Sequence, residues 1–156
     1  MYTLLLVLHS WWRWIVLTAG LYATVKAWQG WKGGLPWPAS GKSVPNLLFL
    51  SAIDLQFVLG ALLYVVSPNV AAARANMAAA MKNGQLRFFT IEHGFMMLIA
   101  TILVHVGFGK AKRGGDAAAR YRVAFIFFGL ALLLILAGVP WPGREAGRPL
   151  FRFDLG

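Results

Sequence analysis

The chain has 156 residues, of which 15 are Lys or Arg, 5 are Asp or Glu, and none is cysteine. Hydrophobic residues make up 59% and charged residues only 13%, whereas a soluble domain carries about a quarter charged residues. This composition argues against a water-soluble globule and, with 14% aromatic residues, excludes a disordered chain. The absence of cysteine excludes disulfides, thiolate metal sites and iron–sulfur clusters.

Four apolar segments are long enough to cross a bilayer, which takes roughly 20 residues of helix at about 1.5 Å per residue. They cover residues 4–28, 47–66, 88–108 and 121–139. The first is expected to remain as a span rather than to be cleaved as a signal peptide, because His9 and Arg13 interrupt it and no basic region precedes it. We predict an all-α membrane protein, with residues 1–156 forming one antiparallel bundle of four transmembrane helices.

Residues 69–82 are rich in alanine but too short and too polar to span a membrane. They predict a short helix at the membrane surface between spans two and three. The short connections make neighbouring helices antiparallel, so both termini should lie on one side. The first and third loops, Lys42 included, hold eight Lys and Arg and the other side holds six. Because basic loops favour the cytoplasm, we expect both termini outside it, and the net charge of +10 fits a membrane surface rather than nucleic acid.

Two histidines lie at matching depth in spans one and three. His9 and His93 are each five residues into their span, about 7.5 Å below the same membrane face. Parallel helices can lie diagonally in a four-helix bundle, where facing side chains build cofactor sites. Two imidazoles at equal depth suit the two axial positions of a haem iron. The structural alternative is that both histidines only hydrogen-bond to Ser10, Tyr64, Glu92 or water.

The third histidine, His105, follows His93 by 12 residues, about 18 Å along the helix. It cannot share the same site, and we expect it near the cytoplasmic interface, hydrogen-bonded or hydrated. Met96 and Met97 follow His93 on its own face. A copper(I) site is therefore a further alternative, although methionines more often only fill a core.

Arg13 lies about 14 Å deep in span one and Asp54 about 18 Å deep in span two. Because a buried unpaired arginine is very costly, we predict a structural ion pair between them. The functional alternative is that Arg13 or Arg87 binds haem propionates or polarises a quinone carbonyl, with Asp54 or Glu92 passing protons. Of the two arginines, Arg87 at the interface is the better propionate partner by depth.

Three segments carry a resemblance to a known group: His9-Ser-Trp-Trp-Arg-Trp14, Arg87-Phe-Phe-Thr-Ile-Glu-His93 and Gly138-Val-Pro-Trp-Pro142. Through them the chain resembles small four-span bacterial inner-membrane proteins that are labelled cytochrome b-like. The resemblance implies a haem-binding or respiratory-chain-associated protein, with His9 and His93 as axial ligands and Arg13, Arg87 and Glu92 around them. The chain lacks the two histidines per helix of the large respiratory cytochromes b, so two stacked haems are not implied.

The sequence therefore favours a multi-pass protein of the bacterial inner membrane that binds one haem b near its outer face and transfers electrons. Its partners would be the lipid bilayer and quinol, a larger redox complex or further copies of the chain. The alternative is a non-catalytic accessory subunit of a respiratory or photosynthetic complex that holds a lipid or quinone. The candidate cofactor-binding residues are His9, His93, Arg13, Arg87, Glu92 and Tyr64.

Overall fold

The computed structural model describes residues 1–40 and 43–153, so Lys42 of the first loop lies outside the described residues. Its long helices are α1 (Tyr2–Lys32), α2 (Val44–Val66), α6 (His93–Arg113) and α7 (Ala117–Gly138). A continuous helical segment runs from Gly84 into α6 through α5 (Gly84–Arg87) and η1 (Phe88–Glu92). Four helices are thus long and apolar enough to cross a membrane, which confirms the predicted all-α, four-span bundle.

α1, α2, α7 and the continuous segment from Gly84 to Arg113 each begin before the predicted span, and α1 and α6 also continue beyond theirs. A helix can continue into the polar interface because its backbone hydrogen bonds are internal, whereas hydropathy marks only the part inside the hydrocarbon. The chain is accordingly a multi-pass membrane protein.

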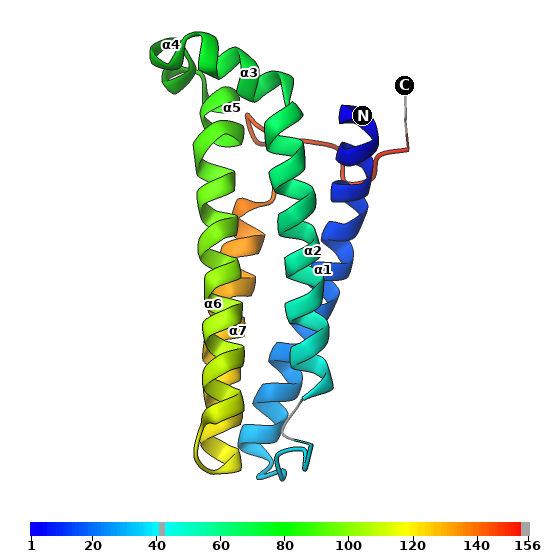
Figure 1. The fold of residues 1–156 in the computed structure, drawn as a ribbon, viewed down its shortest axis with the longest axis vertical. Coiled ribbons are helices and arrows are strands. Elements are labelled where there is room, and N and C mark those ends of the chain that lie inside the picture. Colours follow the sequence, from blue (N-terminus) through cyan, green and yellow to red (C-terminus); the bar gives the residue numbers. More distant parts are fainter. Residues whose placement is uncertain (41–42, 154–156) are drawn as a thin grey trace.

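The four long helices alternate in direction around the bundle (Figure 1). α1 packs against α2 and α7, and α6 packs against the same two neighbours. α1 and α6 therefore lie diagonally, as predicted for the first and third spans. Figure 1 also shows the N-terminus and the end of the described tail at the same end of the bundle, opposite the two loops that join α1 to α2 and α6 to α7.

The bundle is closely packed between its centre and these two loops. Phe49 of α2 and Phe128 of α7 are fully buried there, with perpendicular rings whose centroids are 5.4 Å apart. Gly20 of α1 lies against this pair, because a Cβ added to it would come within 2.9 Å of the Phe49 ring. Small residues that let helices approach closely are typical of packing within membranes.

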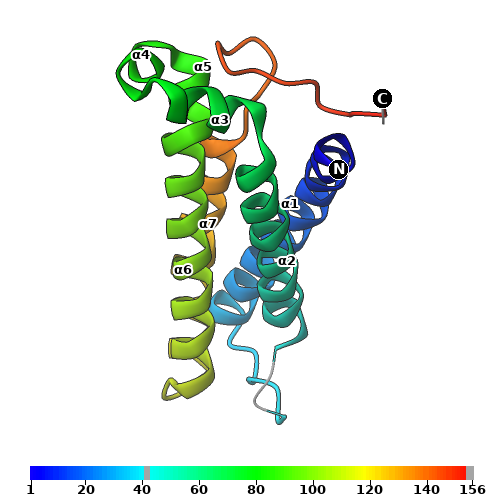
Figure 2. The ribbon, with the colours of Figure 1, turned by 45° about the horizontal axis from the view of Figure 1, so that its top comes forward.

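Three short helices connect the second and third spans at the end of the bundle that carries the termini (Figures 1 and 2). They are α3 (Pro68–Ala75), α4 (Met77–Lys82) and α5, and they confirm a short helical segment at this place, divided into pieces. Asn76 and Asn83 begin α4 and α5 because their side-chain oxygens accept hydrogen bonds from backbone N–H groups. Beyond α7, the tail crosses the same end of the bundle to reach α1 (Figure 2).

Candidate functional site

A cavity of about 470 Å³ lies in the half of the bundle that carries the termini. α1, α2 and α6 supply most of its lining, and the C-terminal tail contributes further residues. Its volume is within the range of about 300–1,000 Å³ that is usual for small-molecule sites. The polar lining includes His9, Arg13, Gln56, Tyr64, His93, Thr101, Arg148 and Arg152.

The structure brings His9 and His93 together at this cavity. Their ring centroids are 6.2 Å apart, with an angle of 76° between the ring planes. Their equal depth in parallel spans thus does lead to a contact, because α1 and α6 face each other diagonally. His105 does not line the cavity.

A π-helical turn directly precedes His93. The backbone N–H of His93 donates to the carbonyl of Phe88, five residues earlier. Such turns add one residue to the helical repeat and are frequent at functional sites. The wider turn also brings Arg87 and Glu92, five residues apart, onto one side, while His93 faces the cavity.

The backbone of α7 fixes which nitrogen of His93 is available. Nδ1 lies 2.8 Å from the carbonyl oxygen of Gly138, which can only accept, so Nδ1 carries the proton. Gly138 is the last residue of α7, where carbonyl groups lack partners within the helix. A histidine held in this way presents the Nε2 lone pair, which is the usual arrangement of a metal-ligating imidazole.

His9 is held by Gln56 of α2. The Gln56 amide nitrogen donates to the His9 carbonyl at 3.0 Å and lies 3.3 Å from Nε2 of its ring. Nδ1 of His9 is buried and has no hydrogen-bond partner among the described residues. Gly60 leaves room for the ring, because a Cβ added there would lie 3.1 Å from Cε1 of His9. A buried polar atom without a partner is costly, so a ligand that engages this ring would be stabilising.

The cavity is positively charged. Arg13 is only 8% exposed, and its Nε is buried without a hydrogen-bond partner among the described residues. Arg148 and Arg152 of the tail also line the cavity, and no Asp or Glu is found among the described residues that line it. Three guanidinium groups without a lining carboxylate favour an anionic group at this place. Sequence reasoning did not identify Arg148 or Arg152 as site residues, although three arginines in a short tail are a detectable signal.

The Trp-Trp-Arg-Trp segment of α1 anchors the tail. Trp11 donates to the carbonyl of Arg152 at 2.8 Å, while Arg13 and Trp14 donate to that of Leu150 at 2.6 Å and 3.3 Å. The Trp14 ring also stacks on Phe151, with centroids 5.4 Å apart. These contacts hold the tail in place, so that its arginines reach the cavity.

The predicted ion pair between Arg13 and Asp54 is wrong. Arg13 donates to the tail, and Oδ1 of Asp54 lies 3.4 Å from Nε2 of His105. Side chains in a helix point towards its N-terminus. Because α1 and α2 run in opposite directions, this tilt moves Arg13 towards the termini and Asp54 towards the loops, and so separates them.

Two other candidate residues lie away from the cavity. Arg87 and Glu92 form an ion pair at 2.6 Å, with side chains that are 45% and 42% exposed. Tyr64 does line the cavity, and its hydroxyl donates to the carbonyl of Thr90 at 3.1 Å. Of the six candidate cofactor-binding residues, four thus surround the cavity and two pair with each other outside it.

The copper(I) alternative would need both Met96 and Met97 beside the histidines. Met97 lines the cavity, whereas Met96 lines a separate hollow beside Arg87. Among residues 1–40 and 43–153, no group of three or more His, Asp or Glu is placed to hold a metal ion. Two imidazoles suit a haem, whose macrocycle supplies four further ligands, better than a bare ion.

Comparison with family models, with curated proteins and with solved structures gave no match to this chain. The function is therefore inferred from the geometry of the site itself.

Proposed function

We propose that this protein is a bacterial inner-membrane protein that binds one haem b in the cavity and transfers electrons. The observation that carries the proposal is the separation of 6.2 Å between the rings of His9 and His93. His9 and His93 would hold the iron of a haem, for which two imidazoles at about this spacing are a suitable pair of protein ligands. The proposal also agrees with the resemblance to cytochrome b-like proteins.

Each histidine would have its own positioning contact. Gly138 orients His93 so that Nε2 is available, and Gln56 together with Gly60 sets the position of the His9 ring. The bound haem would supply one-electron chemistry, while the protein sets its potential through ligands, burial and nearby charge.

The propionates would be held by Arg13, Arg148 and Arg152, which line the cavity, rather than by Arg87, which pairs with Glu92. The positive charge of the three arginines favours the reduced haem, which carries one positive charge fewer than the oxidised form. With both termini in the periplasm, the haem would lie near the outer face, where quinol or a larger redox complex would supply or accept the electrons.

The second candidate is an accessory subunit that holds a quinone or an anionic lipid in the same cavity. Most of the lining is apolar, which suits the hydrocarbon chains of a lipid or quinone. The three arginines suit an anionic headgroup.

An absorption spectrum of the protein, purified from membranes of cells that make haem, separates the two candidates. A bound haem b gives a Soret band and sharp visible bands on reduction. A colourless preparation that co-purifies with stoichiometric quinone or phospholipid contradicts the haem proposal and supports the accessory subunit.

A further inference from the structure

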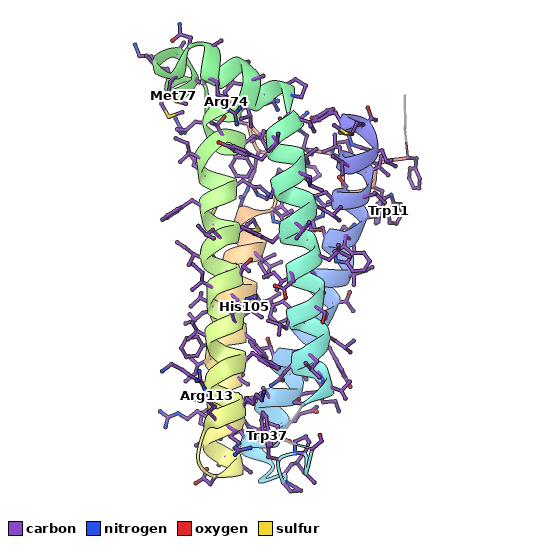
Figure 3. The ribbon with its side chains drawn as sticks, in the orientation of Figure 1. Trp11, Trp37, Arg74, Met77, His105 and Arg113 are labelled. Carbon is purple, nitrogen blue, oxygen red and sulfur yellow. The ribbon has the colours of Figure 1, made fainter. Side chains whose placement is uncertain are left out.

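Asp54 of α2 and His105 of α6 form an ionisable pair on the outside of the bundle. Their side chains are 46% and 50% exposed, and the carboxyl oxygen and ring nitrogen are 3.4 Å apart. Figure 3 shows His105 half-way along the bundle, in the seam between α6 and α2. Neither residue lines the cavity, and the proposed haem site does not use them.

The position of this pair is unusual for a membrane protein. His9, Arg13 and His93 also lie within the spans, but they face the cavity, and Arg87 and Glu92 lie near the end of the bundle. Asp54 and His105 lie about half-way along the bundle, inside their spans, and yet are about half exposed, whereas the sequence placed His105 nearer the end of its span. Ionisable groups at this depth are expensive against lipid and almost always face protein or a water-filled space.

We propose that a second copy of this chain covers the α2–α6 seam, related by a two-fold axis along the membrane normal. Such an axis preserves depth, so Asp54 of one copy can meet His105 of the other only if both lie at the same level. Their contact within one chain shows that they do. The seam carries an acid on one helix and a base on the other, so it is complementary to itself, as an isologous interface requires.

Small residues beside the pair allow the second copy to approach closely. Ser51 lies one turn from Asp54 and is exposed, and Gly109 lies one turn from His105, both on the side towards the loops. A Cβ added to Gly109 would have its nearest neighbour in Arg113 of the same helix, at 3.4 Å, so no other helix of the bundle covers it. Small and polar residues are enriched where membrane helices associate.

Cysteine cross-linking tests the interface directly, because the chain has no native cysteine. Ser51→Cys and Gly109→Cys chains with tags of different size are co-expressed and oxidised in the native membrane. A covalent dimer that contains both tags is expected. Leu133→Cys on α7 is the matched control, because Leu133 is 65% exposed but lies on a different helix. It should give at most a tenth of this product.

Two further measurements complete the test. Asp54→Leu and His105→Leu are introduced together into the Ser51→Cys chain and into the Gly109→Cys chain. They should reduce the cross-linked dimer that contains both tags at least fivefold, while the amount of protein in the membrane stays equal. The unsubstituted protein, labelled with one dye per chain and diluted into lipid vesicles, should bleach in two steps.

Single-step bleaching, equal cross-linking at Leu133→Cys, a mixed dimer that persists in the double leucine variant, or a cross-link to a different protein would each overturn the proposal. Because none of these readouts involves haem, the interface can fail while the proposed function holds, and the reverse is also true.

Discussion

His9 and His93 face each other across the bundle with ring centroids 6.2 Å apart, although they belong to the first and third spans. Each ring has a separate positioning contact, His9 from Gln56 and His93 from Gly138. The two helices pack mainly against α2 and α7 rather than against each other, so the contact depends on side chains that reach across the cavity between them. This relationship makes the pair testable one residue at a time.

If the proposed haem is bound, His9→Ala and His93→Ala should each abolish its spectrum or convert it to a high-spin form, because each would remove one of the two proposed iron ligands. His105→Ala is the control with the same chemical change outside the cavity, and its spectrum should equal that of the parent. Reduced-minus-oxidised difference spectra of the three variants provide the measurement. Loss of haem only in the His105 variant would place the site elsewhere.

Gly60→Leu should displace the His9 ring, because even a Cβ at this position lies 3.1 Å from Cε1 of His9. We expect weaker haem binding by about tenfold with both histidines still present, measured as haem transfer to an apo-globin. Gly129→Leu is the matched control, since the nearest atom to its added Cβ lies at 3.8 Å. Equal effects of the two substitutions would show that Gly60 has no specific role.

Arg148→Gln and Arg152→Gln should each lower the midpoint potential of the proposed haem by an amount on the order of tens of millivolts, because a positive charge near a haem favours its reduced form. Arg144→Gln removes the same charge from a residue that does not line the cavity, and should change the potential much less. Potentiometric titration of the purified variants measures the difference. Three equal shifts would indicate only a general effect of surface charge.

Arg13→Leu and Asp54→Leu should have additive effects on the free energy of unfolding, within about 0.5 kcal/mol, because the two residues share no partner. Arg13→Leu alone should cost about 2 kcal/mol, since it removes a hydrogen bond between a buried charged group and the Leu150 carbonyl. A double-mutant cycle by denaturant titration in detergent gives both values. A coupling of 1 kcal/mol or more would revive the direct pairing.

Two reporters fused after the last residue should behave differently. A reporter that works only after export should be active, and a reporter that works only in the cytoplasm should be inactive. The reason is the larger number of Lys and Arg in the two loops that lie opposite the termini. Fusions in the loop between α6 and α7 should show the reverse pattern. If the two fusions exchange their activities, the cavity lies near the inner face.

The sequence by itself determined the four long helices and the approximate position of each polar residue along its helix, because hydropathy marks the spans and the helical rise fixes distance along the axis. The level pairing of His9 with His93 follows from these two quantities. The rotation of each helix about its axis does not follow from them. Helices surrounded by lipid are apolar on nearly every side and show no clear inward face. For this reason the predicted partner of Arg13 was wrong and the pairing of Asp54 with His105 was missed.

Only the tertiary structure decided what surrounds the two histidines. The π-helical turn before His93 changes which residues share its face, and no local pattern in the sequence marks this extra residue. The tail brings Arg148 and Arg152 to the cavity through carbonyl groups that accept hydrogen bonds from α1. Backbone carbonyls occur at every residue, so the sequence cannot indicate which of them a distant Trp or Arg will reach.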